Sequence, residues 1–104
     1  MCGFAGFLSL QMTQWGEPVL QRMANSIDRR GPDDSGYWID DNEGVALGHR
    51  RLAIVDLSPA GAQPMASGST GSGRYVIAFN GEIYNHLALR GLLYAACNSD
   101  PWRG

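Results

Sequence analysis

Only two segments of this chain show the three- and four-residue apolar spacing of a helix, at residues 17–27 and 85–96. The other apolar residues occur in short runs between turn-forming residues, which is typical of strands. We expect strands at residues 4–10, 37–39, 45–49, 52–56 and 74–79, and a return strand at 82–84 after the hairpin signal Asn80-Gly81. Short connections between successive strands favour antiparallel pairing, so the pattern predicts an α+β fold.

Three stretches are expected to be loops. They are residues 29–36 (RRGPDDSG), residues 58–65, and residues 67–73 (SGSTGSG), the last a flexible connector. None has the character of a linker between domains. A chain of 104 residues is long enough for one domain only.

Composition excludes several function classes. The chain has no Lys, so it has neither a Walker A phosphate loop nor a Schiff-base lysine. The net charge is −2 and the chain has no basic cluster, so its charge pattern does not predict nucleic-acid binding. No apolar run approaches the ~18 residues of a membrane span, and the N-terminus lacks the charged start of a secretory signal. Two cysteines are too few for a disulfide scaffold, so we expect a cytoplasmic protein.

Cys2 is the first candidate for chemistry. If the initiator Met is removed, Cys2 carries both a thiol and a free α-amine. An α-amine is basic enough near neutral pH to act as the local base for the thiol, so such a nucleophile needs no separate His. Position alone is more typical of a small buried residue at the start of a strand.

Two further runs carry candidate residues. In GHRRLAIVDLS (48–58), Arg50 or Arg51 could present a planar fork to a carboxylate, although an arginine pair at a strand end is more often simply solvated. In FNGEIYNH (79–86), the Asn80 amide and the Gly81 N–H could together stabilise an oxyanion, although Asn-Gly alone is usually a turn.

The remaining polar groups suggest no metal site. The acidic cluster at residues 40–43 lacks the spacing of a calcium loop, and His49 and His86 have no zinc-ligand spacing around them. Asp33 and Asp34 are expected to close a turn, and Cys97 is expected to be inert.

Taken together, these segments resemble one family. MCGFAGF, RRGPDDSG, GHRRLAIVDLS with GAQPM, and FNGEIYNHLALR occur in the order of the class II glutamine amidotransferase domain. The similarity is closest to the glutaminase half of glutamine-hydrolysing asparagine synthetases and runs from Met1 to about Arg90. It implies an N-terminal nucleophile hydrolase fold, a four-layer α/β/β/α sandwich.

The resemblance also implies a role for each matching residue. Cys2 would be the nucleophile, forming a γ-glutamyl thioester from L-glutamine and releasing ammonia and then glutamate. Asn80 and Gly81 would form the oxyanion hole. The substrate would be bound by Arg51, which would hold the α-carboxylate, and by Leu52, Ile54, Val55 and Glu82.

In the full family protein, ammonia would pass to a second domain that uses ATP and magnesium to amidate aspartate, and that protein could be a homodimer. Residues 1–104 would then be the N-terminal part of one amidotransferase domain. Ser99-Asp100 is followed by Pro101 rather than by the family's Ser-Asp-(Thr or Cys)-Glu motif, so we expect weak glutaminase activity or none from this chain alone. The alternative is an inactive module that keeps the sheet as a binding scaffold.

Overall fold

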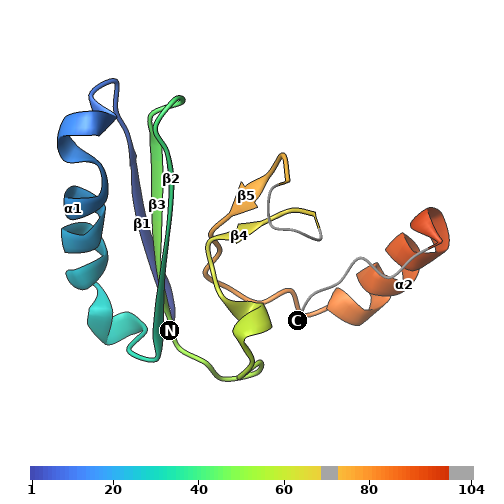
Figure 1. Ribbon diagram of the computed structural model, residues 1–104. Helices are drawn as coiled ribbons and strands as arrows, with labels where there is room; N and C mark the ends of the chain where they lie inside the picture. Colours follow the sequence, from blue (N-terminus) through green and yellow to red (C-terminus); the bar gives the residue numbers. More distant parts are fainter. Residues whose placement is uncertain (69–72, 99–104) are drawn as a thin grey trace.

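The computed structural model describes residues 1–68 and 73–98, with the backbone alone described at residues 12–15. Over these ranges the chain forms two helices, two short 3₁₀ turns (Asp28–Arg30 and Pro59–Gly61) and two antiparallel sheets (Figure 1). The predicted α+β fold class is therefore confirmed. The described helices are all too short or too polar to cross a membrane.

The larger sheet has three strands, β1 (Gly3–Leu8), β2 (Asp34–Asp40) and β3 (Val45–Arg51), with β3 in the centre. β2 and β3 are joined by the predicted polar turn, where the Asp40 carboxylate accepts the backbone N–H groups of residues 42 and 43. Since alternate residues face opposite sides, His49 shares one face with Phe4 and Gly36, its cross-strand neighbours. This face is the one that bears the site.

Helix α1 (Met12–Asn25) covers the opposite face of the sheet (Figure 1). Leu20 and Ala24 from the predicted apolar stripe are fully buried, and Leu20 packs in one cluster with Ala46 of β3. Gly48 permits this approach, because a Cβ there would lie 3.3 Å from the Leu20 side chain. The helix starts five residues earlier than predicted and has non-helical backbone at Gly16, after which the predicted segment follows.

Helix α2 (His86–Cys97) follows Asn85 as predicted, and in Figure 1 it projects away from both sheets. Asn85 occupies the capping position, but its side chain makes no capping hydrogen bond. The helix has exposed leucines on its surface, with Leu87 at 72 % and Leu92 at 69 % exposure. The apolar spacing thus predicts the helix correctly, although the described residues do not bury its apolar side.

Two predicted strands are wrong. Residues 52–56 are irregular, because the Leu52 N–H donates to Cys2 Sγ and the Ala53 N–H donates to the Asp33 carboxylate instead of to a neighbouring strand. Asn80-Gly81 does not form a hairpin, and residues 82–84 form no strand but lead through a turn into α2.

The strand predicted at residues 74–79 is shortened to β5 (Val76–Ile77). It pairs with an unpredicted strand, β4 (Met65–Ala66), which begins at the last residue of the expected loop 58–65. Among the described residues, β5 has no return strand after Asn80-Gly81. The central part of the expected connector, residues 69–72, and the expected C-terminal departure at residues 99–104 lie outside the described residues.

Candidate active site

An open cleft of about 570 Å³ lies at the end of the larger sheet that carries the N-terminus. Its walls come from the chain start, the segment after β3 and the segment after β5. All of the residues to which the family resemblance assigns a role line it: Cys2, Arg51, Leu52, Ile54, Val55, Asn80, Gly81 and Glu82. Arg50, the alternative to Arg51, does not, because its guanidinium donates to the Ala24 carbonyl and the Asn25 side chain. Segments separated by up to about eighty residues in the chain therefore meet at one cavity.

The Cys2 thiol is held by the backbone of Leu52. The Leu52 N–H donates to Sγ at 3.3 Å, and the thiol donates to the Leu52 carbonyl at 3.6 Å. Cys2 is half-buried, and its own carbonyl accepts a hydrogen bond from Arg30 Nε at 3.3 Å. Cys2 directly precedes β1 and Leu52 directly follows β3. The pairing of these two strands therefore places the sulfur at the edge of the cleft.

Arg51 is a buried charge, with 8 % of its surface exposed. Its guanidinium donates to the Ser58 carbonyl at 2.9 Å and to the carbonyl of Asp56. Gly61 packs directly on the guanidinium, since a Cβ at residue 61 would lie 2.5 Å from Nη2. The arginine is thereby fixed in one orientation by backbone groups, while the side chain still lines the cleft.

Asp56 lies next to this arginine. Hydrogen bonds from the side chain and the backbone of Ser58 hold the pKa of Asp56 below its ordinary value, and the Arg51 charge adds to the lowering. Its Oδ2 atom is buried and has no hydrogen-bond partner among the described residues. The cleft therefore contains an ionised carboxylate beside an oriented guanidinium.

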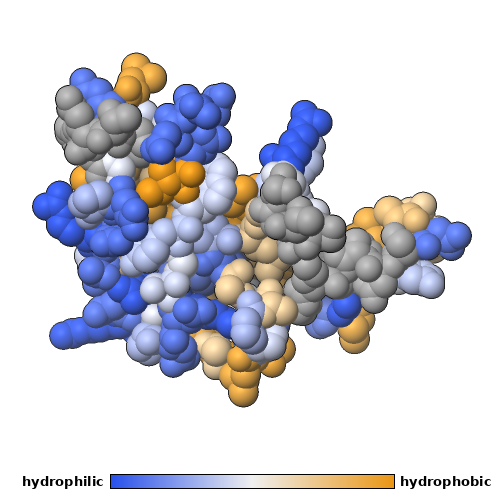
Figure 2. All heavy atoms as spheres, viewed as in Figure 1, coloured by the Kyte–Doolittle hydropathy of each residue, from blue (hydrophilic) through white to orange (hydrophobic). Residues whose placement is uncertain are grey.

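Asn80, Gly81 and Glu82 also line the cleft. Within residues 1–68 and 73–98, neither the Asn80 amide nor the Gly81 N–H has a hydrogen-bond partner. Ile54 and Val55 are 70 % and 84 % exposed at the cleft rim, and Figure 2 shows hydrophobic surface where residues 52–58 pass below the sheet in Figure 1.

Sequence reasoning missed five side chains and backbone groups that also line the cleft: His49, Asp56, Gly61, Gln63 and Phe79. All five lie in motifs already singled out, GHRRLAIVDLS, GAQPM and FNGEIYNH, so the signal is present without an assigned role. Gln63 was the least conspicuous, because a polar residue before Pro64 is typical of an ordinary surface turn.

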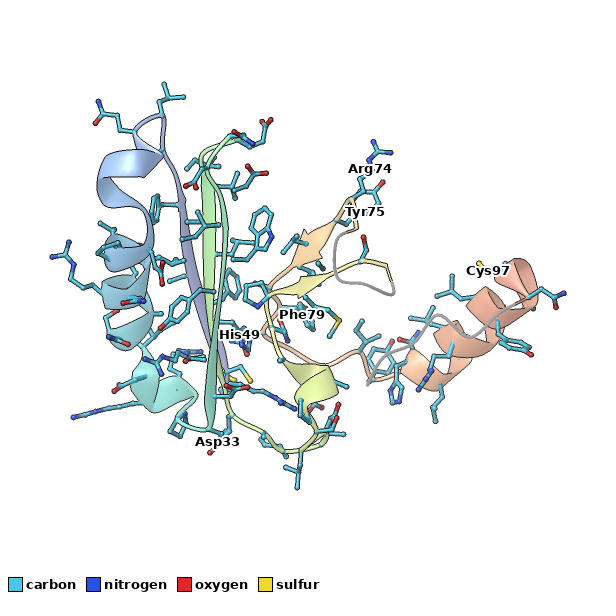
Figure 3. The ribbon with its side chains drawn as sticks, viewed as in Figure 1. Asp33, His49, Arg74, Tyr75, Phe79 and Cys97 are labelled. Atoms are coloured by element: carbon cyan, nitrogen blue, oxygen red, sulfur yellow. The ribbon has the colours of Figure 1, made fainter. Side chains whose placement is uncertain are left out.

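His49 is 1 % exposed, and Figure 3 shows it on β3 beside Phe79. Neither ring nitrogen is in a hydrogen bond with the described residues. Burial is the main cause that holds the pKa of His49 below its ordinary value of 6.5; the nearby Phe79 backbone opposes this shift, and the Arg51 charge adds to it. The ring is therefore neutral at physiological pH. No cluster of three or more metal-ligating side chains occurs in the described part of the chain.

A family model described as a glutamine amidotransferase domain matches residues 1–100. The chain belongs to this family. Two Bacillus subtilis relatives, asparagine synthetases [glutamine-hydrolyzing] 3 and 1, are 41 % and 42 % identical over 92 and 93 residues, each match covering 86 % of this chain. A third relative, amidase chry2 of Gibberella zeae, is 38 % identical over 96 residues and 83 % of this chain.

The amidotransferase match covers only a small part of these relatives. In each of the three, the matched region is 14 % of the relative's length. No solved structure matches the chain. Family membership therefore rests on the match over residues 1–100, and the predicted resemblance to glutamine amidotransferases is confirmed.

Proposed function

We propose that this chain is the glutaminase part of a glutamine-hydrolysing asparagine synthetase, in which the Cys2 thiol attacks the side-chain amide of L-glutamine. The observation that carries the proposal is the convergence of the Cys2 thiol, the Arg51 guanidinium and the free donors of Asn80 and Gly81 on one cleft. A nucleophile, a carboxylate-binding fork and paired N–H donors are the three parts that amide hydrolysis of an amino acid needs.

The nucleophile would be Cys2 after removal of Met1. Its α-amine takes the thiol proton, and the sulfur attacks the amide carbon of glutamine, forming a C–S bond and an oxyanion. The α-ammonium then returns the proton to the departing nitrogen, and the C–N bond breaks to release ammonia and leave a γ-glutamyl thioester. Water, deprotonated by the same amine, attacks the thioester; the C–S bond breaks, glutamate leaves and the thiol regains its proton.

The oxyanion would be stabilised by the Asn80 amide and the Gly81 N–H. Both lie at the cleft, and no hydrogen bond to the described residues has to break for them to serve the transition state. Removing one such donor typically costs about 100- to 1,000-fold in rate.

Substrate binding would combine charge and shape. Arg51 would hold the α-carboxylate with the guanidinium donors that Ser58 and Asp56 leave free, and Glu82 would hold the polar end of the substrate. Leu52, Ile54 and Val55 supply the wall along the aliphatic part. This set favours an amino acid with a side-chain amide over a simple amide.

We further propose that residues 1–104 are the N-terminal part of one amidotransferase domain with the four-layer α/β/β/α sandwich of N-terminal nucleophile hydrolases. Ammonia would be used in another domain, where ATP and magnesium would activate aspartate for amidation. The steps assigned to Cys2, Arg51 and Asn80-Gly81 use neither. The names of the Bacillus subtilis relatives support this context.

The proposal is tested by covalent labelling with the diazoketone analogue of L-glutamine. The thiol protonates the diazo carbon and then displaces dinitrogen, so Cys2 gains one alkyl group that intact-mass spectrometry detects. We expect one adduct per chain, mapped to Cys2 by peptide digestion, and protection by L-glutamine but not by D-glutamine. Absence of labelling, or labelling that L-glutamine does not slow, contradicts the proposal.

The chain offers a matched control for the cysteine. Cys97 is exposed at the end of α2, far from the cleft in Figure 3. Cys97→Ser should keep the glutamine-protected adduct, whereas Cys2→Ser should lose it. Equal adduct formation by both variants would mean that the reagent finds exposed thiols rather than a glutamine site.

A further inference from the structure

Beyond the ends of β4 and β5, the pairing of the two segments continues through a side chain instead of through backbone hydrogen bonds. Met65 pairs with Ile77 and Ala66 with Val76. Extending this antiparallel register by two residues sets Gln63 opposite Phe79. At that position the Phe79 N–H donates to the Gln63 side-chain oxygen at 2.6 Å. The glutamine side chain therefore takes the place of a backbone acceptor at the end of the ladder.

Gln63 is itself fixed to the larger sheet. Its carbonyl oxygen lies directly over Gly36 of β2, where any Cβ would overlap it. Gly36 is also the cross-strand neighbour of His49, which lines the cleft. The backbone of Gln63 thus packs on the sheet that begins next to Cys2, while its side chain reaches across to the segment after β5.

Phe79 connects Gln63 to the two donors of the cleft, the Asn80 amide and the Gly81 N–H. It immediately precedes Asn80, and the tip of its ring packs on Gly81, where a Cβ would lie 2.8 Å from Cζ. Phe79 is therefore held at two points: its backbone N–H donates to Gln63, and its ring packs on Gly81. A shift of Phe79 must move the Asn80 amide and the Gly81 N–H with it.

We propose that Gln63 is a positioning residue for the oxyanion donors: by accepting the Phe79 N–H it holds Asn80 and Gly81 in place at the cleft that Cys2 also lines. This inference rests on the proposed function. Because such donors act on charge that develops in the transition state, Gln63 contributes to the rate of the chemical step and little to the binding of glutamine.

The test compares Gln63→Met, which keeps the side-chain length and removes the acceptor, with the unaltered chain. Labelling by the diazoketone analogue is followed at several concentrations to obtain the maximal rate of Cys2 alkylation and the half-saturating concentration. We expect the maximal rate to fall about tenfold and the half-saturating concentration to change less than about twofold. The final amount of labelled Cys2 normalises both values for the fraction of folded chain.

A second readout does not depend on reactivity. Amide hydrogen exchange at Phe79 should become about tenfold faster in Gln63→Met, while residues of β3 keep their protection. Gln63→Glu retains a side-chain acceptor, so it should preserve the protection of Phe79. The matched control is Gln21→Met on the exposed surface of α1, which should change neither alkylation nor exchange at Phe79.

The outcomes separate the two proposals. If the unaltered chain is not alkylated at Cys2, the proposed function fails, and the exchange measurement alone decides whether Gln63 holds Phe79. If the unaltered chain is alkylated and Gln63→Met reacts at the same maximal rate, the positioning role is overturned. A large rise in the half-saturating concentration at unchanged maximal rate overturns it as well, because Gln63 would then be a binding residue.

Discussion

The sulfur of Cys2 and the backbone of Leu52 form a reciprocal pair, in which the Leu52 N–H donates to Sγ and the thiol donates to the Leu52 carbonyl. A base that removes the thiol proton therefore leaves the sulfur with a donor already in place. The α-amine created by loss of Met1 is the base that we assign to this step.

We therefore expect labelling to occur only on molecules that have lost Met1. The retained Met1 lines the same cleft and converts the amine of Cys2 into an amide, which is no longer basic. Intact-mass spectrometry separates chains with and without Met1 and shows which of them gain the analogue. Equal labelling of both species would show that the α-amine has no part in the reaction.

A second prediction concerns Arg51. In Arg51→Lys, one ammonium group replaces a planar fork that donates to two backbone carbonyls and still faces the cleft. We expect the half-saturating concentration of the diazoketone analogue to rise about tenfold or more, equivalent to about 1.4 kcal/mol of binding. Competition by L-glutamine should weaken in parallel.

Arg22→Lys, on the last turn of α1, is the matched control and should leave both values unchanged. An unchanged half-saturating concentration in Arg51→Lys would show that the carboxylate is bound elsewhere in the cleft.

The parts of this fold that follow from the sequence are those whose partners are close in the chain. Leu20 and Ala24 lie on one helical stripe, and the turn around Asp40 is closed by its own carboxylate, so both are visible as local patterns. Residues 52–56 have the apolar composition of a strand, but their N–H groups bind Cys2 and Asp33, fifty and twenty residues away. Partners at such distances in the chain cannot be predicted from the residues that surround positions 52–56.

The same distinction applies to the site. The candidate residues could be chosen because four motifs resemble a family, and the cleft brings them together. Gln63 could not be chosen, since its importance depends on Gly36 beneath it and Phe79 opposite it. The Asn80-Gly81 hairpin was mispredicted for a related reason: the pairing partner of β5 is β4, ten residues or more before it, and not the segment that follows.

A third prediction tests the small core. Leu20 is fully buried between α1 and β3, and Leu20→Ala should lower the free energy of unfolding by about 2–5 kcal/mol. Leu87→Ala, on an exposed leucine of α2, should change it by less than about 0.5 kcal/mol. Urea denaturation followed by tryptophan fluorescence measures both. Similar losses in the two variants would mean that α2 is covered in solution as thoroughly as α1.

The last prediction concerns His49 and pH. Its pKa lies below the ordinary 6.5 in the folded chain, chiefly because the ring is buried, so the unfolded chain binds a proton first as the pH falls. The stabilising contribution is therefore complete above 6.5 and is lost as the pH falls from 6.5 through the folded-state pKa. The titration of Asp56 does not contribute in this pH range, because the ordinary pKa of its carboxyl, 3.8, is far lower and is lowered further in the folded chain.

His49→Gln cannot take up this proton, so it should lose less stability than the unaltered chain between about pH 7.5 and about pH 5.5. Urea midpoints at the two pH values measure the difference. His86→Gln, which removes an exposed histidine at the start of α2, should keep the pH dependence of the unaltered chain. If the stability of His49→Gln depends on pH as strongly as that of the unaltered chain, the His49 ring is accessible to protons in the folded state. Burial against Phe79 is then not what keeps the ring neutral.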